Sequence, residues 1–293
     1  MALIEYNLDG KRDKVQIALE RIKSFCPISN GMIFDGTDKP KPYYVAYSGG
    51  KDSDVLRILF ELSGVPYNLV HNHTTVDAPE TVRYIRSIPG VHISYPEISM
   101  WALIAKNTMP PTRFVRYCCQ YLKERGGQGQ FVVTGVRWAE SNQRKTRNSL
   151  EVLPKRKENK VVLSADNHEN RKTFENCVTK GTRILNPIID WSDDDVWEFL
   201  NHYNCRSNPL YDCGWKRIGC IGCPMAGSKQ MLRDFEKYPK YKAAYIRAFD
   251  RMIINSQSKP RPSSWATGQE VFDVWTLDFS KKSTILDGQM MLE

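Results

Sequence analysis

The segment YYVAYSGGKDSDVLRILFEL, residues 43 to 62, decides the fold class of this 293-residue chain. It begins as a short run of aromatic and β-branched residues, passes through the glycine loop at 48–53, and continues with the apolar spacing of a helix. Glycines between a strand and a helix leave unpaired backbone N–H groups at the helix start, where the helix dipole also favours an anion. The segment therefore predicts a strand, a phosphate-binding loop and a helix.

Strand-like and helix-like segments alternate after this loop. The predicted strands are 43–47, 67–73, 91–96, 130–136 and 183–188, and the predicted helices are 52–63, 79–88, 98–107, 114–125 and the stretch that begins at the N-cap Ser192. This alternation predicts an α/β, Rossmann-like, doubly wound parallel sheet of five strands with helices on both faces. A nucleotide would then bind at the carboxyl ends of the strands.

Three parts follow one another along the chain. Residues 1–42 form an N-terminal helix and a lead-in, 43–225 form the α/β domain, and 226–293 form a helical C-terminal extension whose first two helices break near Pro239. The N-terminus is charged where a signal peptide needs an apolar run, and no segment approaches the roughly 20 apolar residues of a membrane span. We therefore expect a cytoplasmic protein without a membrane partner.

Charge and cysteine usage narrow the function classes. The chain has 42 basic and 33 acidic residues, a formal net charge of +9, and eight cysteines. A basic excess indicates polyanions or anionic substrates as partners, with a generally solvated basic surface as the alternative. Cysteines in a chain without a secretory signal indicate metal binding or catalysis rather than disulfides.

The loop can be compared with known phosphate-binding patterns. It is neither G-x-x-x-x-G-K-[ST] nor G-x-G-x-x-G, but Ser-Gly-Gly-Lys-Asp-Ser matches the PP-loop of the ATP pyrophosphatases, which cut ATP between the α and β phosphates. The glycines allow close backbone approach, the two serine hydroxyls can donate to phosphate oxygens, and the lysine and aspartate suit phosphate and Mg²⁺. The alternative is a plain glycine turn. The predicted nucleotide-binding residues are Ser48, Gly49, Gly50, Lys51, Asp52 and Ser53, with Lys51 and Asp52 also catalytic.

Two close cysteine pairs form a second motif, Cys118-Cys119 and Cys220-x-x-Cys223. Four thiolates suit either a tetrahedral zinc or a [4Fe–4S] cluster. Adjacent residues on a helix diverge by about 100°, since a turn holds ~3.6 residues. That divergence suits two corners of a larger cluster better than one small ion and mildly favours the [4Fe–4S] cluster.

The order of these motifs resembles the phosphoadenosine and adenosine phosphosulfate (PAPS/APS) reductase family of the PP-loop superfamily, in its cluster-bearing branch. The matching stretches are VDAPET, PPTRFVRYCCQYLKE, TGVRWAESNQR, NPIIDWSDDDVWEFL and NPLYDCGWKRIGCIGCP, which span about residues 43 to 225 with the PP-loop. The resemblance implies that the four paired cysteines hold a [4Fe–4S] cluster. It also implies a nucleotide pocket lined by Asp77, Glu80, Gly135, Arg137 and Arg144.

The chain departs from the reductases at one point. Reductases of this family carry a catalytic cysteine in a C-terminal Glu-Cys-Gly-Leu-His segment, whereas this sequence has no cysteine after Cys223. The retained ATP-binding and cluster-binding parts resemble sulfur-inserting relatives, including the DndC-like proteins of DNA phosphorothioate modification and the PP-loop thiolases of tRNA.

The other cysteines and a basic run complete the candidates. Cys213 and Cys205 are candidates for a sulfur relay through a persulfide, with inert packed cysteines as the alternative, and Cys26 and Cys177 are expected to be structural. The run at 142–160 is expected to be a loop, either a flap or arm that contacts phosphate or a solvated segment.

The expected function is adenylation of a substrate by ATP, with release of pyrophosphate, for sulfur transfer onto an acceptor such as a nucleic acid. A cysteine desulfurase would be a suitable sulfur-donor protein. One alternative is a phosphosulfate reductase that produces sulfite with a borrowed thiol. The other is a non-catalytic, nucleotide-sensing Fe–S subunit of a defence or modification complex.

Overall fold

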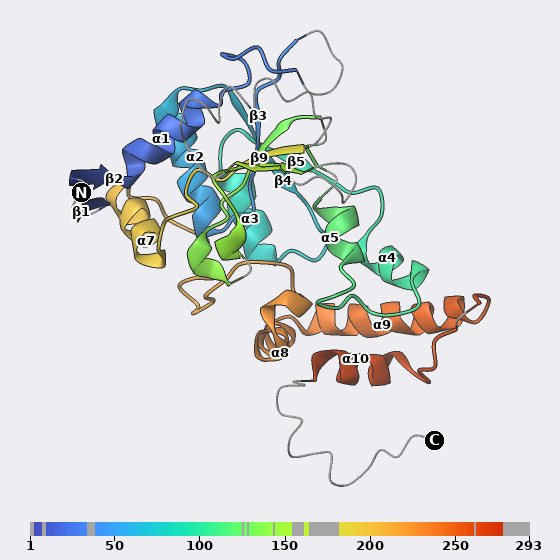
Figure 1. Cartoon of the computed structure of the whole chain (residues 1–293). Helices are drawn as coiled ribbons and strands as arrows, with labels where there is room; N and C mark the ends of the chain where they lie inside the picture. The colour runs from blue at the N-terminus through green and yellow to red at the C-terminus, as the bar shows by residue number, and fades with distance from the viewer. Residues whose placement is uncertain are drawn as a thin grey trace. The chain divides into compact units, whose positions relative to one another are not determined.

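In the computed structural model of the chain (Figure 1), the segment 43–62 lies in β3 (Tyr43–Ala46), a glycine turn, and α2 (Lys51–Ser63). Gly49 has a φ of +72°, and a Cβ there would lie 2.8 Å from the Ile85 side chain, so glycine is needed at this position. Gly64, with a φ of 66°, ends α2 in the left-handed conformation common at helix C-termini. The predicted strand, loop and helix are confirmed.

The structure describes residues 3–7, 10–33, 39–124, 126–127, 129–142, 144–153, 161–163, 182–260 and 262–277. It divides into two compact units: the first is Met1–Asn72, Pro79–Ser94 and Arg125–Ile218, and the second is His73–Ala78, Tyr95–Glu124 and Gly219–Glu293. The units interleave along the chain, whereas the predicted parts follow one another. Both the segment after β4 and the cysteine-bearing segments belong to the second unit.

The first unit contains a seven-stranded sheet of order β5-β4-β3-β6-β9-β7-β8. Five neighbouring strands are parallel, as the sequence predicts: β5 (Val91–Ser94), β4 (Tyr67–Asn72), β3, β6 (Phe131–Val133) and β9 (Thr182–Leu185). Two antiparallel strands, β7 (Leu150–Leu153) and β8 (Val161–Leu163), extend it beyond the predicted five. The prediction of a loop over 142–160 is wrong at β7, because Leu150 pairs with Leu185 of β9.

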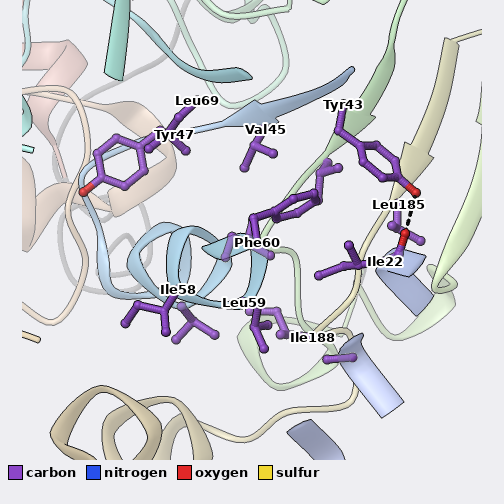
Figure 2. Close-up of a cluster of buried hydrophobic side chains, with 14 of the residues drawn as sticks. Ile22, Tyr43, Val45, Tyr47, Ile58, Leu59, Phe60, Leu69, Leu185 and Ile188 are labelled. Carbon is purple, nitrogen blue, oxygen red and sulfur yellow. Dashed lines mark hydrogen bonds between the residues drawn. The ribbon is translucent and has the colours of Figure 1, made fainter. Parts of the chain in front are cut away.

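Helices cover one face of this sheet and form the core with it. α1 (Lys14–Ser24) packs on α2, and α2 packs on α7 (Asp193–His202). Figure 2 shows Tyr43 and Val45 of β3 over Phe60 of α2, and the Tyr43 hydroxyl donates to the Ile22 carbonyl at 3.1 Å. α3 (Pro79–Ser87) follows in the same unit, and an unpredicted hairpin of β1 (Ile4–Asn7) and β2 (Gly10–Asp13) precedes α1. The loop at 48–53 is therefore mounted on a packed strand and helix.

The second unit is helical. It contains α4 (Met100–Lys106), α5 (Tyr117–Leu122), α8 (Ser228–Lys237), α9 (Pro239–Ser256) and α10 (Gly268–Thr276). α9 packs along α4 and α10, and α9 and α10 lie side by side in Figure 1. The predicted break at Pro239 is confirmed, since proline is tolerated in the first turn of a helix but not in its interior. Within the described residues, none of the helices has the length and apolar character to cross a membrane.

A buried carboxyl group lies inside the first unit, just after the loop. The side chain of Asp54 on α2 is fully buried, and its Oδ1 accepts a hydrogen bond from the Tyr47 hydroxyl at 2.6 Å. Burial raises the pKa of Asp54 to about 6, although the hydrogen bond from Tyr47 opposes the shift. Because an unfolded aspartate titrates near pH ~3.9, Asp54 stabilises the fold below that pH, and this contribution is lost as the pH rises through about 6.

We therefore expect Asp54→Asn to flatten the pH dependence of stability. Between about pH 3.5 and 7.5, the unfolding free energy of the variant should rise by about 3 kcal/mol relative to that of the parent protein, because a raised pKa of this size corresponds to ~1.4 kcal/mol per unit. Urea unfolding at a series of pH values measures this difference. Parallel pH profiles for the two proteins would show that Asp54 does not titrate in this range.

Candidate functional site

The glycine loop is held by its own side chains. The Ser53 hydroxyl accepts from the Gly50 amide at 3.1 Å and donates to the Gly50 carbonyl at 2.7 Å, which caps the start of α2. The Ser48 hydroxyl lies 3.3 Å from that of Ser53. The Lys51 amide donates to the Tyr211 hydroxyl at 2.9 Å. Hydroxyl groups and amides thus gather at the positive end of a helix, which is an arrangement that suits phosphate.

Two cations and two carboxylates meet at this helix start, and we call them the four-charge group: Lys51, Asp52, Arg137 and Asp193. Lys51 Nζ lies 3.1 Å from Asp52 Oδ1 and 2.8 Å from Asp193 Oδ1. Arg137 makes matching contacts, with Nε 2.7 Å from Asp52 Oδ1 and Nη2 2.8 Å from Asp193 Oδ1. The hydrogen bonds from Lys51, and next those from Arg137, lower the pKa of Asp193, so this carboxyl is charged at neutral pH.

Gly135 explains how the arginine reaches the loop. A Cβ at Gly135 would lie 3.0 Å from Asp52 Cβ and 3.2 Å from the Asp52 carbonyl oxygen, so the absence of a side chain favours the close approach of this stretch to α2. Gly135 follows β6, and the loop follows the neighbouring parallel strand β3. The carboxyl ends of parallel strands meet at one sheet edge, where open α/β sheets bind ligands. The structure brings predicted residues Gly135 and Arg137 to the loop.

Arg144 adds further positive charge in the same unit. It lies in a short helix, η2 (Arg144–Thr146), and forms an ion pair with Glu140 of η1 (Trp138–Glu140). Burial and then the charges of Arg217 and Arg147 lower the pKa of Arg144. Positive charges gathered near Arg144 create a positive potential that attracts an anion.

Three first-unit residues of this site were missed by the sequence analysis: Asp193, Asn208 and Tyr211. Asn208 is buried, and its Nδ2 donates to the Gly49 carbonyl at 3.1 Å and to the Thr81 hydroxyl at 3.0 Å. Asn208 and Tyr211 lie in the NPLYDCGWKRIGCIGCP stretch, which the sequence analysis used only for its cysteines. Glu80, a predicted pocket residue, is half-buried in the first turn of α3.

Asp77, also predicted in the nucleotide pocket, belongs to the second unit. Its carboxylate accepts from the Thr74 amide and the Thr74 hydroxyl, both at 2.7 Å, and its backbone forms a bridge with Cys220. The same segment holds Thr75 at a φ of 64°. A β-branched residue rarely adopts this left-handed conformation, which typically costs about 1–3 kcal/mol and is common at functional sites.

The four paired cysteines all lie in the second unit, and we call them the cysteine group: Cys118, Cys119, Cys220 and Cys223. α5 carries the first pair, Cys223 directly precedes the short helix η3 (Pro224–Ala226), and all four side chains are half-buried. The Sγ of Cys220 lies 3.4 Å from the Thr74 hydroxyl. A hydrogen bond from Cys118, and next one from Arg116, lowers the pKa of Cys119 to about 5.

The cysteine group fits an iron–sulfur cluster by the chemistry of its donors. The charges of Cys220 and Cys223 contribute to the raised pKa of Cys118, behind its hydrogen bond to Cys119 and burial, so the two pairs interact. The charge of Cys220, the largest cause, and those of other thiolates raise the pKa of Lys123. Lys123 therefore supplies a cation that compensates the thiolates. Among the described residues, no three His, Cys, Asp or Glu side chains form a ready-made metal-binding group. The donor kind and number therefore fit, while the ligating arrangement itself is not preformed.

The remaining cysteines differ in their surroundings. Cys205 is half-buried with its Sγ 3.5 Å from Arg57 Nη2, and burial, with a contribution from Asp54, raises its pKa. Cys213 is exposed. A raised pKa disfavours the reactive thiolate, so Cys205 has the properties of an unreactive thiol. Cys26 is buried in the first-unit core, and Cys177 lies outside the described residues.

Comparison with known protein families gives one match that covers more than half of the chain. The model of the phosphoadenosine phosphosulfate reductase domain matches residues 42–226. An uncharacterized protein of Methanocaldococcus jannaschii is 27% identical over 218 residues, which cover 69% of this chain and 46% of that protein. The adenosine 5'-phosphosulfate reductase of Allochromatium vinosum is 41% identical over 46 residues, 16% of this chain and 18% of the reductase.

Solved structures with similar folds include two enzymes of different activity. The phosphoadenylyl-sulfate reductase of Candida auris has 16% identity and a TM-score of 0.41, with 74% of this chain and 97% of that chain covered. The U34-tRNA thiolase NcsA of Methanococcus maripaludis, solved with its [4Fe–4S] cluster, has 12% identity and a TM-score of 0.40, with 83% and 79% covered. The chain spans less than half the length of the two Methanocaldococcus jannaschii proteins it matches.

Proposed function

Because the chain belongs to the phosphoadenosine phosphosulfate reductase domain family, we propose that it binds ATP at the loop 48–53 and transfers the adenylyl group to a substrate oxygen. The four-charge group at the start of α2 is the observation that carries this proposal. Its two cations meet Asp193 at the start of α2, the helix that follows the loop hydroxyls, and a chain of phosphates bound at the loop would need positive charge there.

Each group of this site has a role in the proposed reaction. The substrate oxygen bonds to the α-phosphorus while the bond from that phosphorus to the β-bridging oxygen breaks, so pyrophosphate leaves with the electron pair. Lys51 and the loop amides stabilise the charge on the departing pyrophosphate. Arg137 orients the phosphates, and Asp52 would hold Mg²⁺, which supplies further charge neutralisation when bound.

The adenylated oxygen then becomes the point of sulfur transfer. A sulfide-level sulfur bonds to the substrate atom that carries the adenylated oxygen, while the bond from that atom to the oxygen breaks and the oxygen leaves as part of AMP with the electron pair. Because a donor protein carries the sulfur as a persulfide, two electrons from a thiol reductant release it at the sulfide level. The cysteine group would hold a [4Fe–4S] cluster, which would supply a binding point for the incoming sulfur. A sulfur-donor protein such as a cysteine desulfurase is the partner that this step requires.

A nucleic acid is the acceptor that the surface chemistry supports. The net charge is +9. In the second unit the side chain of Phe114 is 96% exposed between Arg113 and Arg116, which are also exposed. A turn presents it, since the Phe114 and Val115 amides donate to the Thr112 hydroxyl at 3.3 and 3.0 Å. An exposed ring between arginines suits base stacking with phosphate contacts.

The products of ATP cleavage test this proposal. The protein, purified without oxygen, is incubated with ATP labelled at the α or the γ phosphate, with and without transfer RNA. We expect AMP and pyrophosphate, formed faster with the acceptor. ADP and inorganic phosphate would contradict the proposal. ATP binding without any products would instead indicate a non-catalytic subunit, and sulfite from phosphosulfate nucleotides with thioredoxin would indicate a reductase.

A further inference from the structure

The two cations of the four-charge group are already occupied by protein carboxylates. Lys51 Nζ and Arg137 Nη2 both lie 2.8 Å from one oxygen, Asp193 Oδ1. Two further guanidinium N–H groups are engaged, since Arg137 Nε donates to Asp52 Oδ1 at 2.7 Å and Nη1 donates to the Trp191 carbonyl at 3.2 Å. A phosphate oxygen in the place of the Asp193 oxygen would reach both cations together.

A carboxylate oxygen can stand in for a phosphate oxygen at such donors. Charge-assisted N–H···O bonds to either anion have lengths of about 2.7–2.9 Å, and the contacts of Asp193 Oδ1 fall in this range. With two cations and two carboxylates, the group has no net formal charge. When one carboxylate withdraws, the group keeps a net positive charge, which attracts a polyanion more strongly.

We propose that Asp193 is a resident anion of the phosphate site, which competes with the phosphates of the nucleotide for Lys51 and Arg137. The inference rests on the proposed binding of nucleotide phosphates at the loop. Asp193 then lowers the affinity of the site for phosphates, and a ligand displaces it only if the ligand carries enough negative charge to compete for the two cations.

Exposure identifies Asp193, rather than Asp52, as the carboxylate that withdraws. The Asp193 side chain is 64% exposed, whereas that of Asp52 is 24% exposed. Asp52 also lies under the closely approaching Gly135. An exposed carboxylate regains its hydration when it leaves the cations, while a more buried one does so less fully.

Separate contacts hold α7 in place, so the release of Asp193 needs only a side-chain movement. The Ser192 hydroxyl accepts from the Asp195 amide at 3.1 Å, and the Asp195 carboxylate accepts from the Ser192 amide at 2.7 Å. Lys14 of α1 pairs with Asp195 at 2.7 Å. These contacts anchor the start of the helix independently of the four-charge group.

Titration calorimetry with inorganic pyrophosphate tests the inference on the full chain. We expect Asp193→Asn to bind pyrophosphate about tenfold more tightly than the parent protein, within the usual range for coupling between two competing ligands. Asp194→Asn is the matched control. It removes the same charge from the same exposed first turn of α7, but Asp194 makes no ion pair with Lys51 or Arg137 in the described part of the chain. Circular dichroism verifies that both variants are folded.

The sign of the change distinguishes the outcomes. A general effect of net charge would tighten binding equally in the two variants, and a supporting role of Asp193 would weaken binding in Asp193→Asn; either result overturns the inference. If the parent protein binds pyrophosphate, Lys51→Ala abolishes binding and Asp193→Asn shows no gain, the inference fails while the proposed function stands. If none of the proteins binds pyrophosphate, both fail.

Discussion

Lys51→Ala is expected to lower the rate of ATP cleavage to AMP and pyrophosphate by about 10²–10³-fold, the usual loss when one preorganised electrostatic donor is removed from an active site. Lys51 begins α2, its side chain is 9% exposed, and its ammonium group contacts Asp52 and Asp193. The charge that develops on departing pyrophosphate would then lack this cation. The rate is measured under saturating ATP, so that the loss reports kcat rather than weaker binding of ATP.

A lysine of the second unit supplies the control for this substitution. Lys240 is exposed in the first turn of α9, so Lys240→Ala removes the same charge from the chain without touching the loop. Its turnover should equal that of the parent protein. Unchanged turnover in a normally folded Lys51→Ala variant would show that the loop is not part of the catalytic site.

The core of the fold can be predicted from local sequence patterns, because each pattern indicates both the type of an element and the residue at which it begins or ends. The glycines of the loop fix a strand-to-helix turn, and Pro239 fixes a helix start. The strand β7 carries no such signal. Glu151 is fully buried there and is paired at 2.9 Å with Arg147, which precedes the strand, so a charged residue of the run that indicated a loop lies inside a strand with its charge compensated. The sequence shows that a residue is charged, but it does not show whether an oppositely charged residue lies close enough to allow its burial.

The site divides in the same way between local and tertiary information. The loop and Gly135 can be recognised in the sequence because their glycines allow backbone conformations or close approaches that other residues do not favour. No backbone requirement marks Asp193 in the sequence. At the start of α7 its sequence context indicates only that an acidic residue is favourable at a helix N-terminus. Its contact with Lys51 arises because β3, β6 and β9 end at one sheet edge, which brings residues far apart in the sequence together.

The cysteine pairs were visible from spacing, yet their surroundings were not. The Thr74 hydroxyl accepts from the Cys220 thiol at 3.4 Å and donates its own proton to Asp77, so a residue far from the C-x-x-C motif shapes its environment. The assignment of Asp77 to the nucleotide pocket came from the family resemblance and stays a prediction; in the second unit its carboxylate accepts from Thr74 and its backbone forms a bridge with Cys220.

Cys220→Ser is expected to abolish iron binding. The parent protein purified without oxygen should be brown and carry about four irons per chain, as a [4Fe–4S] cluster held by four cysteines requires. A serine hydroxyl is a much poorer ligand for cluster iron than a thiolate, and the three remaining cysteines would leave one corner open. Iron analysis and the visible absorption of the protein measure the loss.

The choice of control makes this prediction specific to the cysteine group. Cys213→Ser removes an exposed thiol of the first unit and should keep the full iron content and colour. Equal iron in the two variants would exclude Cys220 as a ligand. If the protein purified without oxygen contains zinc in stoichiometric amount and no iron, the cysteine group holds a tetrahedral zinc ion and not an iron–sulfur cluster. Because a loss of folding would also lose iron, both variants are compared by circular dichroism before the metal is counted.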